Sequence, residues 1–290
     1  MNNCFLPPKQ IRWDIDLIRL YLIISLVIYH SFAPFTGDWE NLYSTTSSLY
    51  RWIGMYAYSF MLETFVFISG LLFGIQILNS SNYYPFKIIL KKLKRLVIPS
   101  VLWSSVYYFL YKDINLPIET IVYRIFNGVG HMWFLPMLFW CFMFTLVIER
   151  MKIGRKYIVC ILLLCSCCSG VGLPFQLGKT MYYLFFFYIG YLLGKKELNF
   201  PWGNKGNIVL YSVCLFNISF IVLTLFRNYY TSIIFDSYSF TFISKMCLLI
   251  INNCTKLCYS VIGVYMIYII AQKTIQIFNI FNKKWGGCIY

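Results

Sequence analysis

Acidic residues and histidine are scarce in this sequence. Its 290 residues include only 10 Asp and Glu and 2 His, and charged residues of either sign make up only 12%. A soluble domain carries roughly a quarter charged residues. A chain that is 60% hydrophobic therefore has too little polar surface to cover a water-facing globule, and we predict that lipid surrounds it.

The sequence also lacks the patterns of a metal site or of a secreted disulfide-linked protein. Most of its 11 Cys lie within apolar runs and show no ligand spacing with either His. We therefore expect no metal ion and no disulfide framework. The first apolar run has no small-residue cleavage site, so we expect it to remain as a signal anchor. A G-x-S-x-G nucleophile motif is absent as well.

Basic residues are abundant, and the net charge is +15. They concentrate in the short connections 79–95, 149–157, 195–206 and 253–256. Cytoplasmic loops carry an excess of Lys and Arg, so this distribution predicts a cytoplasmic N-terminus. No basic face with base-stacking aromatic residues lies outside the apolar runs, and we expect no nucleic-acid partner.

Apolar runs long enough to approach the 20 residues that a spanning helix needs predict an all-α, polytopic bundle of about nine helices. We expect one integral membrane domain over residues 1–290, with a polar tail at 273–290. After nine crossings the tail would lie outside, although it carries Lys273, Lys283 and Lys284. Either one predicted span is wrong or a final span is missing. The predicted spans are 17–34, 56–78, 96–111, 132–148, 158–172, 180–194, 207–226, 238–252 and 257–272.

Ionisable residues inside spans are expensive and are functional candidates by default. Asp16, Arg19 and His30 fall on nearly one helix face, with Arg19 and His30 about 16 Å apart along the axis. Glu63 is the only carboxylate well inside a span, and its depth matches that of His30 to within one turn. A His–Glu hydrogen bond would orient the ring and stabilise an imidazolium. The alternative is that Arg19 sets topology and that the other two residues pair with unrelated polar groups.

Two further clusters flank the membrane. Lys91, Lys92, Lys94 and Arg95 form a basic run before Pro99. This run is either a topology signal or a clamp for the phosphates of an anionic cytoplasmic donor. On the outer side, His131 and Trp133 begin the fourth span and are candidates for substrate binding, although Trp133 also suits an interface anchor. Gly70 and Gly190 suit close helix packing.

Taken in order, these motifs resemble the acyltransferase-3 family of membrane-bound acyltransferases. Asp16-Leu17-Ile18-Arg19 with His30 is similar to the family's D-G-L-R-G start and following His, although both glycines are replaced. The segment from Glu63 to Leu72 resembles D-x-F-F-V-x-S-G-F-L, and Lys91, Lys92 and Arg95 take the basic places of R-R-x-x-R-x-x-P. The segments His131–Leu135, Phe187–Gly194 and Gly263–Tyr268 are similar to H-L-W-F-L, a later helix and G-x-Y-L-I-H. Tyr268 stands where the family has His, and the tenth span usual in the family is not evident.

The resemblance implies a multi-pass protein of the cell (inner or plasma) membrane that transfers an acyl group. The group is usually acetyl from acetyl-CoA, and the acceptor is a hydroxyl of a cell-surface polysaccharide or its lipid-linked precursor. It also implies that Arg19 and His30 are the essential pair and that the basic run meets the donor. His30 acts either as a general base or as a carrier of the acyl group. A glycan or lipid transporter and a non-catalytic, truncated homologue remain alternatives.

Overall fold

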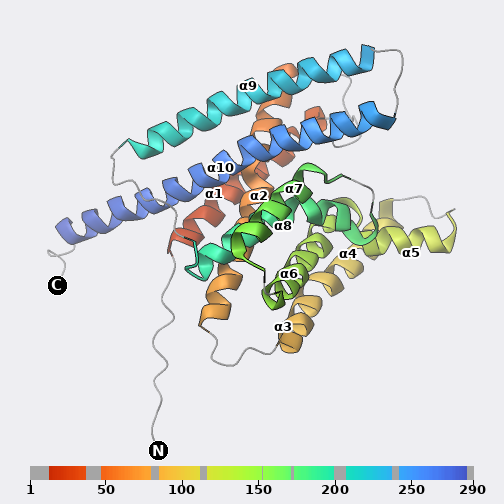
Figure 1. Ribbon diagram of the computed structural model, residues 1–290, viewed down its shortest axis with the longest axis horizontal. Coiled ribbons are helices and arrows are strands. Elements are labelled where there is room, and N and C mark those ends of the chain that lie inside the picture. The colour runs from red at the N-terminus through yellow and green to blue at the C-terminus, as the bar shows by residue number, and fades with distance from the viewer. Residues whose placement is uncertain are drawn as a thin grey trace, which may run out of the picture. The chain divides into compact units, whose positions relative to one another are not determined.

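The computed structural model describes residues 13–36, 47–79, 85–111, 116–151, 153–170, 173–198, 207–236 and 242–285. All regular elements in these ranges are helical, which confirms the all-α prediction. The elements (Figure 1) are α1 (Trp13–Thr36), α2 (Ser48–Leu78), α3 (Pro85–Lys92), the π-helix η1 (Leu93–Val97), α4 (Ile98–Tyr111), α5 (Ile118–Asn127), the 3₁₀ helix η2 (Gly130–Trp133), α6 (Phe134–Arg150), α7 (Arg155–Cys167), the 3₁₀ helix η3 (Pro174–Gln176), α8 (Leu177–Gly194), α9 (Ile208–Asp236) and α10 (Phe242–Trp285).

Helices long and apolar enough to cross a bilayer confirm the multi-pass prediction. Within the described ranges there are five such segments, at Ile15–Thr36, Ser48–Leu78, Gly130–Arg150, Ile208–Ile233 and Ser244–Phe278. Large apolar side chains lie exposed on these helices, for example Val27 of α1 and Ile218 of α9, as expected for surfaces that face acyl chains. The predicted spans at 96–111 and 158–172 correspond to α4 and α7, which have 14 and 13 residues and are short for a complete crossing.

The prediction of two spans at 238–252 and 257–272 is wrong, because α10 runs unbroken from Phe242 to Trp285. The predicted cytoplasmic connection 253–256 consists of Asn253, Cys254, Thr255 and Lys256, and none of these is a Gly or Pro that would end a helix. The Asn253 amide instead donates to the Cys167 carbonyl, at 3.2 Å. The polar residues that suggested a loop therefore satisfy contacts within the bundle.

The chain divides into two compact units, which we describe separately. The first comprises residues 1–65, 202–220 and 259–290. Here Gly263 of α10 lies so close to α2 and α9 that an added Cβ would be 2.5 Å from the Phe60 Cβ and 3.0 Å from the Phe216 ring. The Ser260 hydroxyl donates to the Ser59 carbonyl at 2.7 Å. Helix α10 therefore packs directly on α2 within this unit.

The second unit comprises residues 66–201 and 221–258, and glycines bring two of its helices into backbone contact. A Cβ on Gly70 would lie 1.9 Å from the Phe187 carbonyl oxygen, and one on Gly190 would lie 2.1 Å from the Phe67 carbonyl oxygen. Gly74 and Gly194 repeat this arrangement one turn further along. The C-terminal half of α2 and α8 thus interlock through two small-xxx-small motifs, which confirms the packing predicted for Gly70 and Gly190.

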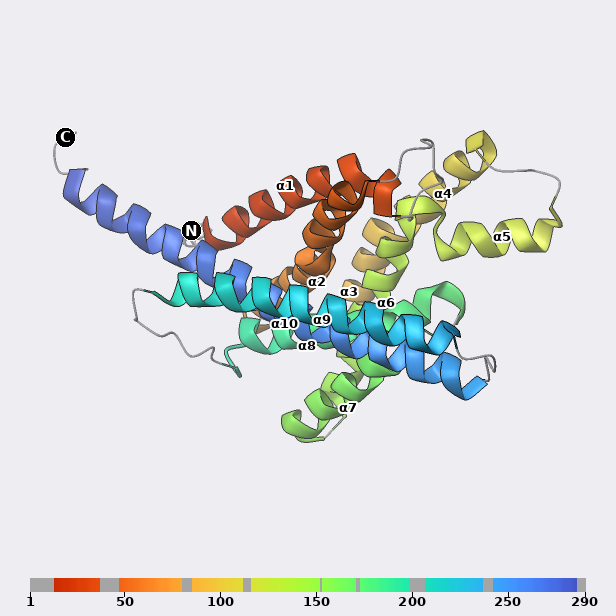
Figure 2. The ribbon, with the colours of Figure 1, turned by 90° about the horizontal axis from the view of Figure 1, so that it is seen from above.

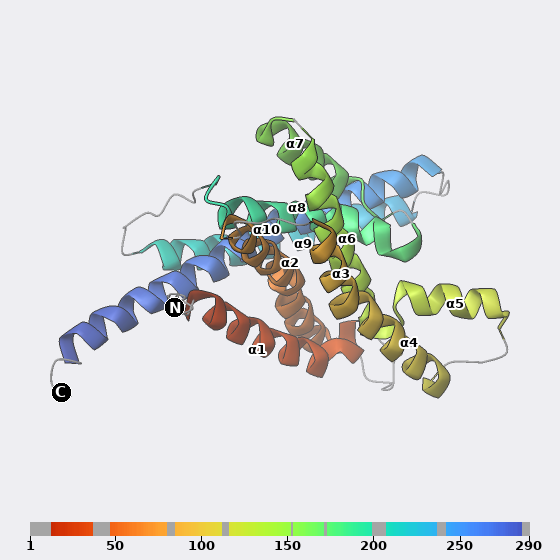
Figure 3. The ribbon, with the colours of Figure 1, turned by 90° about the horizontal axis from the view of Figure 1, so that it is seen from below.

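In the second unit, α3, η1 and α4 form one continuous helical path alongside α6 (Figures 2 and 3). The π-turn places the Ile98 N–H against the Leu93 carbonyl, five residues earlier. Pro99 follows directly, and its ring lacks an N–H and would crowd the carbonyl four residues before it. A widened turn accommodates the proline here, and π-turns of this kind are frequent at functional sites.

Candidate functional site

The first predicted cluster lies on α1, in the first unit. The Arg19 guanidinium contacts the Asp16 carboxylate at 3.3 Å, and both side chains are about half exposed. A pair this exposed contributes little to stability. The structure therefore brings Asp16 and Arg19 together as predicted and leaves the guanidinium accessible to a ligand.

His30 lies further along α1 and is half-buried. Its ring is 5.3 Å from that of Tyr29, which in turn lies 4.6 Å from the ring of Tyr58 on α2. Glu63, on the same helix as Tyr58, is completely buried. The Tyr29–Tyr58 contact therefore holds α1 beside α2 next to His30, and the direct pairing of His30 with Glu63 stays a prediction.

The predicted donor clamp spans the junction of α3 and η1, in the second unit. Lys91, Lys94 and Arg95 are exposed, whereas Lys92 is half-buried. The Lys92 ammonium lies 3.7 Å from the centroid of the Phe142 ring, a cation–π geometry. Burial lowers the pKa of Lys92 to about 8, and the positive charges of Arg95 and Lys91 add to this effect. A bound anion would stabilise the charged form of Lys92.

The predicted outer cluster lies on η2, which several bonds hold in place. The Ser100 hydroxyl of α4 donates to the Met132 carbonyl at 3.1 Å, and the Val129 N–H donates to the Ser104 hydroxyl at 3.0 Å. Gly128 has a φ of 82°, and a Cβ there would lie 2.5 Å from the Trp133 nitrogen. The backbone that carries Trp133 is therefore fixed by α4 and by a turn that requires glycine.

Two lysines that sequence reasoning did not select lie around Trp133. The Lys179 ammonium of α8 lies 3.8 Å from the centroid of the Trp133 ring. The Lys256 ammonium of α10 lies 4.8 Å from the Tyr182 ring and 5.5 Å from the Tyr183 ring. The sequence predicts Lys256 in a cytoplasmic loop. The local signal for this cluster is the position of Lys179, one turn before Tyr182 and Tyr183.

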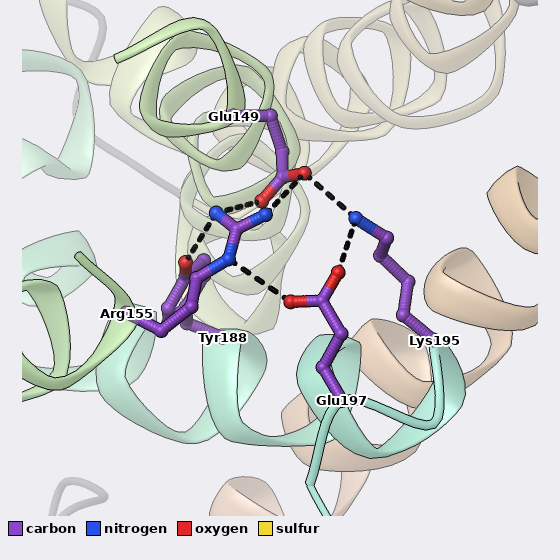
Figure 4. A network of polar contacts seen from close by, with 5 residues as sticks. All are labelled: Glu149, Arg155, Tyr188, Lys195 and Glu197. Carbon is purple, nitrogen blue, oxygen red and sulfur yellow. Dashed lines mark hydrogen bonds and ion pairs between the residues drawn. The ribbon is translucent and has the colours of Figure 1, made fainter. Parts of the chain in front are cut away.

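A network of charges joins the ends of α6, α7 and α8 (Figure 4). Arg155 pairs with Glu149 and Glu197, and Lys195 pairs with the same two carboxylates at 3.0 and 2.6 Å. Arg155 also donates to the Tyr188 hydroxyl at 3.1 Å. Two cations and two anions form a neutral ring here, so the network suits a structural role better than the binding of an anion.

In the described part of the chain, no three His, Cys, Asp or Glu side chains are grouped closely enough to hold a metal ion. The sequence matches the family described as "Acyltransferase domain" over residues 12–285, which include all the candidate residues above. No curated protein and no solved structure matches the chain significantly.

Proposed function

This chain belongs to the acyltransferase-3 family of membrane acyltransferases, and from that premise we propose that it moves an acetyl group from cytoplasmic acetyl-CoA to a hydroxyl of a cell-surface polysaccharide or its lipid-linked precursor. The proposal is supported by the Tyr29–Tyr58 contact, which joins α1 to α2 next to His30, and by the complete burial of Glu63 on α2. Ionisable groups inside membrane helices destabilise the protein, so those that occur there are functional candidates.

In the proposed reaction His30 acts on the acceptor. As the sugar oxygen attacks the thioester carbonyl carbon, the imidazole takes the hydroxyl proton, and the carbon–sulfur bond then breaks to release the CoA thiolate. The imidazolium returns its proton to that thiolate. Glu63 would stabilise the imidazolium if the two side chains pair, because an adjacent carboxylate favours the charged ring.

The donor would bind at the basic run. Lys91, Lys94 and Arg95 offer exposed cations, and Lys92 offers a partly buried one whose charge lacks full solvation. Ammonium and guanidinium groups form charge-assisted bonds with phosphates, and acetyl-CoA carries its phosphates at the end remote from the thioester.

The test is acyl transfer in membranes that contain the full-length protein. Membranes are incubated with acetyl-CoA labelled in the acetyl group, and the label is measured in the glycan fraction. His30→Ala should abolish incorporation, since general base catalysis contributes about 10²–10⁴-fold. Ser31→Ala is the matched control, because Ser31 is the exposed neighbour on α1 and its hydroxyl donates to the Val27 carbonyl of the same helix.

Retained incorporation in His30→Ala membranes would remove the catalytic role of this residue. No incorporation by the wild type, together with movement of a labelled glycan across the membrane, would favour a transporter instead. If labelled protein can be trapped from the wild type but not from His30→Ala, the reaction passes through an acyl-histidine intermediate and not through direct transfer.

The donor site has its own test. Arg95→Ala should raise the KM for acetyl-CoA and leave the dependence of the rate on acceptor concentration unchanged.

A further inference from the structure

The cations around Trp133 form one continuous cluster with aromatic rings in the second unit. The rings of Trp133 and Tyr183 are 6.1 Å apart. Lys179 covers the first ring at 3.8 Å, and Lys256 lies 5.5 Å from the second. Three separate elements, η2, α8 and α10, thus direct a Trp and two Lys toward the same place.

The two ammonium groups repel each other. Burial lowers the pKa of Lys179 below its ordinary value, and the positive charge of Lys256 lowers it further. Within the described part of the chain, Lys179 faces an indole ring rather than a carboxylate. An anion that binds near both ammonium groups would offset their mutual repulsion.

The scaffold fixes both lysines. Asn253, one turn before Lys256 on the same face of α10, donates to the carbonyls of Cys167 and Ser169 at the end of α7. Lys179 lies in the first turn of α8, where the Gln176 amide donates to the Asn127 carbonyl at 2.8 Å. These bonds hold the helix turns that carry the two lysines, which favours a preorganised site.

We propose that Lys179, Lys256 and Trp133 bind a phosphate group of a lipid-anchored ligand. A phosphate presents several oxygens that accept from two ammonium groups at once, and the indole face supplies an apolar platform for the adjoining isoprenoid or sugar. The inference rests on the proposed function, since it makes the acceptor a glycan attached to lipid through phosphate. Sequence-based topology puts His131 and Trp133 on the outer side, where such an acceptor is presented.

Binding of a short polyprenyl phosphate tests the site directly. Full-length protein in a non-ionic detergent is titrated with farnesyl phosphate, with farnesol as the uncharged control, and affinity is measured by thermophoresis. Wild-type protein should bind the phosphate at least tenfold more tightly than the alcohol. Lys179→Gln and Lys256→Gln should each weaken phosphate binding roughly tenfold, because a hydrogen bond to a charged group is lost.

Controls separate charge from folding. Lys179→Arg keeps the positive charge and should retain binding, while Lys156→Gln removes an exposed charge at the start of α7 and should change nothing. Equal affinity of the wild type and the Lys179→Gln/Lys256→Gln double variant for farnesyl phosphate overturns the proposal.

A second titration with phosphatidylglycerol distinguishes the sources of the phosphate. Lysine-dependent binding of farnesyl phosphate supports the acceptor assignment. Lysine-dependent binding of phosphatidylglycerol alone overturns that assignment and makes the occupant a membrane lipid. If neither ligand binds in a lysine-dependent way while His30-dependent acylation is intact, only the proposed phosphate site is refuted. Lysine-dependent binding without any acylation would refute the proposed function and leave the site standing.

Discussion

Two nitrogens of the Arg155 guanidinium contact the two carboxylate oxygens of Glu149, at 2.6 and 3.1 Å. This bidentate pair joins the last turn of α6 to the first turn of α7, and Lys195 and Glu197 close the ring beyond α8 (Figure 4). The basic residues that indicate cytoplasmic loops in the sequence thus also hold three helix ends together.

Glu149→Gln should lower the stability of the protein, because Arg155 and Lys195 then share the single carboxylate of Glu197. Breaking a fully buried pair costs about 3–5 kcal/mol, but Arg155 is 36% exposed, and we expect roughly 1–2 kcal/mol once solvent screening is considered. The thermal midpoint in detergent would fall by several degrees. Glu119→Gln, an exposed carboxylate on α5, provides the control, and equal midpoints for both variants would contradict a stabilising ring.

Acidification should weaken the same ring. Burial raises the pKa of Glu197, but the Lys195 hydrogen bond and the charges of Arg155 and Lys195 outweigh it and leave the pKa below its ordinary value. A carboxylate with a lowered folded-state pKa contributes stability above its unfolded pKa and loses it as the pH falls through the folded value. Melting midpoints of Glu197→Gln should therefore depend less on pH below about 4.5 than those of the wild type. Parallel acid profiles would show that Glu197 contributes nothing.

Use of the donor should depend on pH through Lys92. Its pKa of about 8 means that the free protein loses this charge as the pH rises through 8, whereas an ordinary lysine stays charged to about pH 10. The value of kcat/KM for acetyl-CoA, which reports ionisations of the free enzyme, should fall above pH 8. Lys92→Arg should keep its charge and remove this decline, and an unchanged decline in that variant would assign it to another group.

Local patterns predicted much of the fold, and long-range contacts supplied the rest. The apolar runs at 17–34, 56–78, 132–148 and 207–226 correspond to α1, α2, α6 and α9. Gly70 and Gly190 were recognised because small residues in apolar helices have one common use. The proximity of Lys179 and Lys256 and the closure of the Arg155 ring arise from tertiary packing, and no spacing in the sequence encodes them.

The continuity of α10 changes the expected topology of the chain's end. One helix replaces the two spans that the sequence predicts. If the other seven predicted spans all cross, including those at the short helices α4 and α7, Lys283 and Lys284 would lie on the inner side, in agreement with the positive-inside rule. A helix of 44 residues is about 66 Å long, well beyond the 30 Å of a hydrocarbon core. A fluorescent protein fused after residue 290 should therefore fold and fluoresce in the cytoplasm, while a fused alkaline phosphatase, active only outside, would stay inactive. The reverse pair of results would restore an odd number of crossings.

The helices α2 and α8 pack so closely that one added methyl group at their contact should destabilise the protein. In Gly190→Ala the new Cβ would lie 2.1 Å from the Phe67 carbonyl oxygen and 3.0 Å from the Leu71 nitrogen, and both are backbone atoms that cannot rotate away. The helices must separate, which weakens the packing that drives association in lipid, and we expect a loss of about 2–4 kcal/mol. Gly154→Ala is the matched control, because its Cβ would meet only the Tyr157 ring at 3.2 Å. Gly190→Ala should therefore give less folded protein by size-exclusion chromatography and a lower melting midpoint, and wild-type behaviour would mean that the two helices pack less tightly than this geometry requires.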